Sequence, residues 1–107
     1  MVEPLLPEDF ADLLPFLDWS LETERARIEK KAETPMHDIR AFYDAMMARL
    51  DEILRYLEGC FGQDMPAPAH RLYLMSLSLV EVATLVELYK RREAVKACDP
   101  RRFVPQD

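Results

Sequence analysis

The sequence contains little glycine, and this shortage restricts the fold. Only Gly59 and Gly62 occur among 107 residues, whereas glycine usually makes up about 7% of a chain. Sheets with tight hairpins use glycine in their turns, so the shortage argues against a β-rich fold. Leu, Ala, Glu, Arg and Met, which all favour helices, supply much of the chain. The composition therefore predicts an all-α protein.

The residue patterns of metal sites and of common catalytic sites are also absent. Cys60 and Cys98 are isolated, and the histidines, His37 and His70, form no Glu-x-x-His pair of the kind found in di-metal helical bundles. The sequence has no glycine-rich phosphate loop, nucleophile elbow or Cys-x-x-Cys motif. We therefore expect no catalytic residues, no metal and no cofactor, and the sequence favours a binding role over an enzymatic one.

A signal peptide and a membrane span are not predicted either. The first residues, Met-Val-Glu-Pro, lack the basic and apolar regions of a signal peptide. The most apolar stretch, residues 72–88, is shorter than the ~20 residues that a span needs. It also carries Glu81 at its middle, where a charge costs about 2.5–3.5 kcal/mol on insertion scales. We expect a cytoplasmic protein with free thiols and no membrane contact.

The charge of the chain is acidic and unevenly distributed. The net charge is −6, residues 1–24 contain no Lys or Arg, and residues 90–102 are rich in both. A nucleic-acid site needs a basic face, so we expect no nucleic-acid binding. The charged ends remain available for a second protein partner.

Prolines divide the chain into three segments. Proline is tolerated in the first turn of a helix and is costly further inside, so Pro35, Pro66 and Pro68 mark helix starts. We expect three main helices in an antiparallel up-down bundle: one over roughly 7–33, one from Pro35 to Gly59 or Gly62, and one over about 67–96. A short extra helix is expected before Pro15. The whole chain, 1–107, forms one domain with irregular tails at 1–6 and 99–107.

The apolar side chains of residues 72–88 point in more than one direction around a helix. One sector contains Leu72, Met75, Leu79, Val82 and Val86, and a nearly opposite sector contains Leu74, Leu77, Leu85 and Leu88. A helix that is apolar all round must be covered all round, and the second half of segment 7–33 is too charged to cover a whole sector. We therefore predict a homodimer and place its interface on the first sector, although the composition does not separate the two.

The leading hypothesis is a small interaction or accessory module that homodimerises through the helix near 70–90. The alternative is a small-molecule-binding bundle, because methionine and aromatic side chains adapt to irregular apolar ligands. Glu81 is expected to pair with an Arg or a Tyr, or to lie at the edge of the interface. The predicted pocket is lined by Phe42, Tyr43, Met46, Met47 and Glu81.

Overall fold

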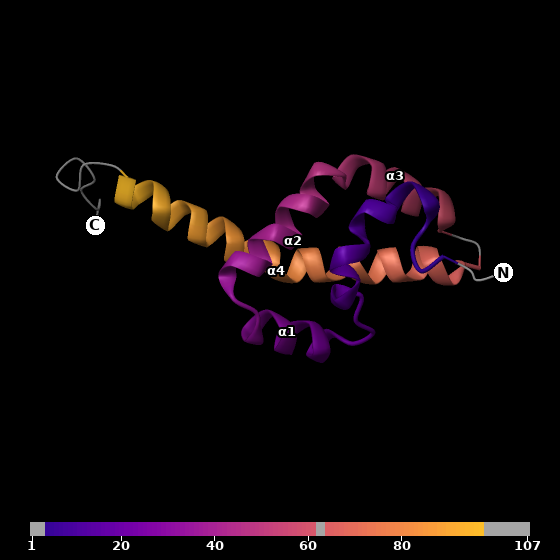
Figure 1. The fold of residues 1–107 in the computed structure, drawn as a ribbon, viewed down its shortest axis with the longest axis horizontal. Coiled ribbons are helices and arrows are strands. Elements are labelled where there is room, and N and C mark those ends of the chain that lie inside the picture. The colour runs from indigo at the N-terminus through magenta and orange to yellow at the C-terminus, as the bar shows by residue number, and fades with distance from the viewer. Residues whose placement is uncertain (1–3, 62–63, 98–107) are drawn as a thin grey trace.

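The computed structural model describes residues 4–61 and 64–97, and this part of the chain is helical apart from its connections. The all-α prediction is confirmed. Figure 1 shows that the last helix runs along the whole molecule and that the other helices lie around its first and middle parts. The elements are η1 (Glu8–Trp19), α1 (Glu24–Glu33), α2 (Met36–Ala48), α3 (Leu50–Cys60) and α4 (Ala67–Ala97).

The helix expected over residues 7–33 is divided into η1 and α1. η1 is a 3-10 helix that contains Pro15, and its backbone leaves helical geometry at the next residue, Phe16 (φ −108°, ψ 17°). Proline removes a helical hydrogen bond, which explains the break that we expected near Pro15. The larger interruption follows Trp19. There Thr23 Oγ1 accepts a hydrogen bond from the Ala26 N–H at 3.1 Å and caps α1.

The helix expected to run from Pro35 to Gly59 or Gly62 is divided at Arg49, so the prediction of three main helices is wrong. Arg49 lies in the bridge region (φ −113°, ψ 9°) between α2 and α3. Its guanidinium reaches η1, where it donates to the Asp9 carbonyl at 2.8 Å and lies 4.7 Å from the Phe10 ring centroid. The apolar pattern did not reveal the break because Met46 and Ile53, on either side, are both fully buried in one core.

The core is built around one face of α4, and this corrects the predicted interface. The five side chains of the first sector are at most 5% exposed, because η1, α2 and α3 pack on them within the same chain. They cannot also form a dimer interface. The core residues that face them include Phe10, Leu13, Trp19, Ile39, Phe42, Met46, Ile53 and Leu57.

Polar contacts attach the end of η1 to α4. Ser78 is completely buried, and its hydroxyl donates to the Trp19 carbonyl at 2.6 Å. The next residue, Ser20, donates through its hydroxyl to the Arg71 carbonyl at 3.0 Å. The Trp19 ring stacks on Phe42 of α2, with a centroid separation of 4.7 Å and an interplanar angle of 8°. These contacts fix the position of Trp19 between α2 and α4.

α4 begins and ends close to the expected residues 67–96. Its C-terminal end extends beyond the other helices (Figure 1), as the charged sequence after Tyr89 predicts. Residues Ala67–Arg92 are long and apolar enough to cross a membrane by length and composition, with a mean hydropathy of 1.5. η1, α1, α2 and α3 pack against α4 and bury 39% of its most apolar window, and the absence of membrane contact stays a prediction.

Candidate functional site

The side of α4 that faces away from the core carries a row of apolar side chains. Four apolar residues and Thr84, spaced three or four apart, share this side, and we call them the outer stripe: Tyr73, Leu77, Val80, Thr84 and Leu88. Tyr73 is half-buried and also packs against the core. Val80 is 70% exposed and Leu88 is 48% exposed. Phe61, which is 58% exposed, extends the row at one end. Its ring and that of Tyr73 are perpendicular, with their centroids 6.2 Å apart.

Ion pairs border the outer stripe. Glu81, predicted to pair with an Arg or a Tyr or to lie at an interface edge, is half-buried and pairs instead with Lys31 of α1 at 3.3 Å. His70 lies 3.6 Å from Glu22, whose side chain is largely exposed. Toward the C-terminal end the helix becomes basic, with Lys90, Arg91 and Arg92. The stripe therefore has an acidic group near its first end and a basic cluster beyond its last.

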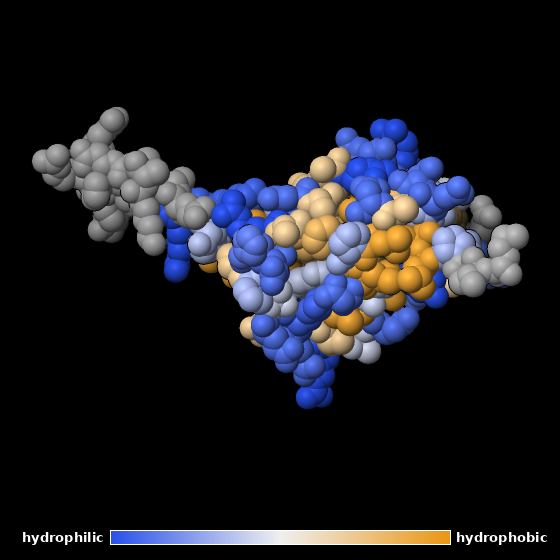
Figure 2. Space-filling model, in the orientation of Figure 1, coloured by the Kyte–Doolittle hydropathy of each residue, from blue (hydrophilic) through white to orange (hydrophobic). Residues whose placement is uncertain are grey.

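A second apolar area lies on another side of the molecule. Figure 2 shows it over the region of η1. Leu5, just before η1, is 49% exposed and Leu14, within η1, is 40% exposed. This area competes with the outer stripe as a contact surface, so any test of assembly must separate the two.

The structure does not bring the residues of the predicted ligand pocket together around a cavity. Phe42, Tyr43 and Met46 are packed in the core, at most 4% exposed, whereas Met47 on the same helix is 42% exposed. None of the residues Phe42, Tyr43, Met46, Met47 and Glu81 lines any of the three cavities described. Helical periodicity points three of the residues at α4, where side chains fill the space, so the described cavities give the pocket prediction no support.

Tyr43 has a polar contact that the sequence did not reveal. Its hydroxyl donates to the Glu87 carboxylate of α4, and the Lys90 ammonium lies 4.9 Å from the centroid of its ring. The hydrogen bond to Glu87, together with burial, raises the pKa of Tyr43 above the usual 10.0. The phenol is therefore a buried donor that joins α2 to α4 rather than a group able to ionise in a reaction near neutral pH.

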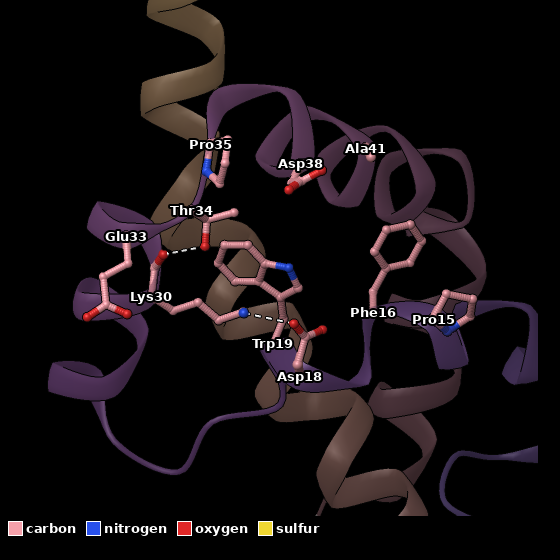
Figure 3. Close-up of a pocket in the computed structure, with 10 residues that line it drawn as sticks. All are labelled: Pro15, Phe16, Asp18, Trp19, Lys30, Glu33, Thr34, Pro35, Asp38 and Ala41. Atoms are coloured by element: carbon pink, nitrogen blue, oxygen red, sulfur yellow. Dashed lines mark hydrogen bonds and ion pairs between the residues drawn. The ribbon is translucent and has the colours of Figure 1, made fainter.

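The most distinctive cavity lies between η1, α1 and the start of α2 (Figure 3). Its volume is about 410 Å³, and no residue of α4 lines it. Figure 3 shows the Trp19 indole at its centre, with Lys30 reaching across from α1 and Asp38 pointing in from α2. The lining residues are Pro15, Phe16, Asp18, Trp19, Lys30, Glu33, Thr34, Pro35, Asp38 and Ala41.

One cation of the chain already occupies part of this cavity. The Lys30 ammonium lies 4.8 Å from the centroid of the Trp19 ring and 2.8 Å from the Asp18 carboxylate. The helix that carries Lys30 ends there, where Thr34 donates through its hydroxyl to the Lys30 carbonyl at 2.6 Å. An ammonium held by an aromatic face and a carboxylate is a cation–π arrangement.

Sequence reasoning missed this cavity. In the sequence Trp19 is an isolated aromatic residue, and Asp38 only favours the start of its helix by charge. Proline at residue 35 places Asp38 in a first helical turn, but nothing in the sequence shows that this turn lies beside Trp19. That proximity depends on the break after Trp19 and on the docking of Ser78.

The remaining candidate residues are dispersed. His37 is exposed, and Cys60 lies half-buried beside Tyr56, whereas Cys98 lies outside the described residues. Burial, with a smaller contribution from Cys60, raises the pKa of Tyr56 above 10.0. Within residues 4–61 and 64–97 no three His, Cys, Asp or Glu side chains gather in a way that could hold a metal ion.

Comparisons with known proteins add no functional assignment. No protein-family model, no curated protein and no solved structure matches the chain. The functional argument therefore depends on the outer stripe and on the cavity at Trp19.

Proposed function

We propose that this protein is a homodimeric helical interaction module that assembles through antiparallel pairing of the outer stripes of two α4 helices. The observation that carries the proposal is Val80, a large aliphatic side chain that is 70% exposed at the middle of an apolar row. Soluble chains tend to cover contiguous apolar surface through association. The proposal keeps the predicted homodimer but moves its interface to the opposite side of the helix.

The spacing of the outer stripe is self-complementary. A twofold axis beside Val80 places Tyr73 opposite Leu88 of the partner subunit and Leu77 opposite the partner's Thr84, because each pair is centred on the same point of the helix. A twofold interface uses the same patch on both subunits. Apolar residues three and four positions apart are also the pattern by which one helix packs along another.

Charge favours the antiparallel direction. In that orientation the basic end of α4, with the exposed Arg91 and Arg92, approaches the beginning of the partner's α4. There Glu22 lies beside His70. Parallel pairing would place the two basic ends together instead, and repulsion of like charges disfavours that arrangement.

The expected affinity is moderate. Full burial of a Val or Leu side chain contributes about 1.5–3 kcal/mol, and Val80 and Leu88 still have 70% and 48% of their surface to bury. Four such side chains in a dimer supply several kcal/mol, which must offset the loss of free motion on association. We therefore expect a dissociation constant in the micromolar range.

Sedimentation velocity over roughly 1–500 μM, a range that brackets this affinity, tests the proposal. The wild-type chain should shift from monomer to dimer, and Val80→Glu should remain monomeric. Leu54→Glu is the matched control, because Leu54 is 52% exposed on α3 and should leave the equilibrium unchanged. A monomer at the highest concentration refutes the proposal. Dissociation by Leu14→Glu but not by Val80→Glu assigns the interface to the η1 area instead.

Disulfide trapping tests the direction of pairing. In a chain with Cys60→Ser and Cys98→Ser, a cysteine at Val80 lies next to the twofold axis and should cross-link to itself under mild oxidation. A cysteine at Tyr73 should cross-link to one at Leu88 but not to itself. Self-linking at Tyr73 would contradict the antiparallel arrangement.

A further inference from the structure

The cavity at Trp19 has a chemistry that the proposed dimer does not use. Three acidic residues line it, Asp18, Glu33 and Asp38, against the single base Lys30. The floor is aromatic, since Trp19 and Phe16 both contribute. An aromatic face combined with an excess of carboxylates attracts organic cations and repels anions.

Two polar groups in the cavity have no partner within the described part of the chain. The side chain of Trp19 is buried, with only 3% of the residue exposed, and its indole nitrogen faces the cavity in Figure 3. This N–H donates no hydrogen bond to any described residue. The Asp38 carboxylate also points into the cavity (Figure 3) and forms no ion pair among those residues. No side-chain nitrogen or oxygen of the described residues is fully buried without a partner, so the indole nitrogen is open to solvent in the cavity and its N–H is available to the acceptor of a ligand.

Lys30 shows which kind of ligand suits the remaining space. Its ammonium uses the Trp19 face and Asp18, at 4.8 Å and 2.8 Å, but leaves Asp38 and the indole N–H free. A ligand that adds a second cation next to Asp38 and a carbonyl next to the indole N–H would complete the site. An arginine or lysine residue within a peptide supplies both groups.

We propose that this cavity binds a basic side chain of a peptide, arginine in the first place, with the guanidinium on Asp38 and on Phe16, the part of the aromatic floor that Lys30 does not cover. The indole N–H of Trp19 donates to a carbonyl of the same peptide. Arginine is favoured over lysine because its planar guanidinium stacks on aromatic rings and bonds carboxylates through two N–H groups. The site is distinct from the outer stripe and does not depend on dimerisation.

The probe is N-acetyl-arginine amide, and the neutral isostere N-acetyl-citrulline amide is its control. Trp19 is the only tryptophan in the chain, so its fluorescence reports directly on the cavity. We expect a saturable change with the arginine compound in the millimolar range, as suits one small exposed cation site. The citrulline compound should give at least a fivefold weaker response. Equal responses to the two compounds, or none to either, would overturn the proposal.

Variants then locate the binding. Asp38→Asn should weaken arginine binding at least threefold. Asp44→Asn removes the same charge from the same helix outside this cavity and should change binding less than 1.5-fold, as expected for a screened distant charge. Lys30→Met should strengthen binding about threefold, because it removes the competing ammonium while keeping the length of the side chain.

Each outcome bears on the proposal. Equal losses in Asp38→Asn and Asp44→Asn would refute a specific site, and so would weaker binding in Lys30→Met. Circular dichroism checks that each variant is folded. If Asp38→Asn fails to fold, Lys30→Met, with its expected gain in affinity, remains the test of the site.

Discussion

The hydrogen bond from Ser78 to Trp19 provides the most direct test of how α4 holds the cavity in place. Ser78 is fully buried on α4, and its hydroxyl donates to the Trp19 carbonyl at 2.6 Å. Ser78→Ala removes this bond and creates only a small void. A net hydrogen bond is worth about 0.5–1.5 kcal/mol, and a carbonyl left entirely unpaired would cost more.

The structure decides where in that range the effect should lie. The Trp19 carbonyl also accepts from the Leu21 N–H at 3.1 Å, so it keeps one partner in the variant. We therefore expect Ser78→Ala to lower the free energy of unfolding by about 1 kcal/mol, which corresponds to roughly 4–5 °C in Tm for a domain of this size.

Urea unfolding measures this change, with circular dichroism and Trp19 fluorescence followed at one fixed protein concentration because dimerisation would add stability. Ser76→Ala is the control. Ser76 donates to the carbonyl of Tyr73 in its own helix at 2.6 Å, and its loss should change stability by less than about 0.5 kcal/mol. Equal effects of the two substitutions would refute the argument that the long-range bond matters.

Three further predictions concern the pKa values and the packing of named groups. The hydrogen bond from Arg49 holds the pKa of Asp12 below its usual 3.8, so Arg49→Gln should raise the NMR titration midpoint of Asp12. The stability from this pair is present above pH ~4 and is lost as the pH falls through the folded pKa. Glu87→Gln should lower the raised pKa of Tyr43 toward 10.0, measured by ultraviolet absorbance. The Tyr43 contribution to stability is present below pH ~10 and is lost as the pH rises through the folded value. Met46→Ala should cost about 2–5 kcal/mol in urea unfolding, because Met46 is fully buried.

The helical class and the last helix could be predicted from the sequence because they depend on local properties. Glycine scarcity and proline positions are read directly, and α4 begins at Ala67, within the expected boundary. The break at Arg49 could not be read, because it is fixed by contacts of the guanidinium with Asp9 and Phe10 of η1, about forty residues earlier. A tertiary contact of this kind leaves no trace in the periodicity of the helix it interrupts.

Tertiary contacts also decide which apolar sector of α4 is covered within the chain, and the sequence pattern does not show this. Both are rich in large aliphatic residues, and the sequence alone assigned the interface to the sector that the chain itself covers. What decided the matter was the division of residues 7–33, which allows η1 to place Phe10, Leu13 and Trp19 on α4 while α1 pairs with Glu81 from the side. One straight helix could not have done both.

The same division separates the two surfaces that we assign to function. The cavity at Trp19 is formed where η1 ends and α1 and α2 meet, and no residue of α4 lines it. The outer stripe lies on α4 and shares no residue with the cavity. Pairing of two outer stripes would therefore leave both cavities open, and a substitution at Val80 acts on assembly without touching Asp38 or Trp19. The failure of either proposal leaves the evidence for the other unchanged, since Val80→Glu and Asp38→Asn alter different elements and are read by different measurements.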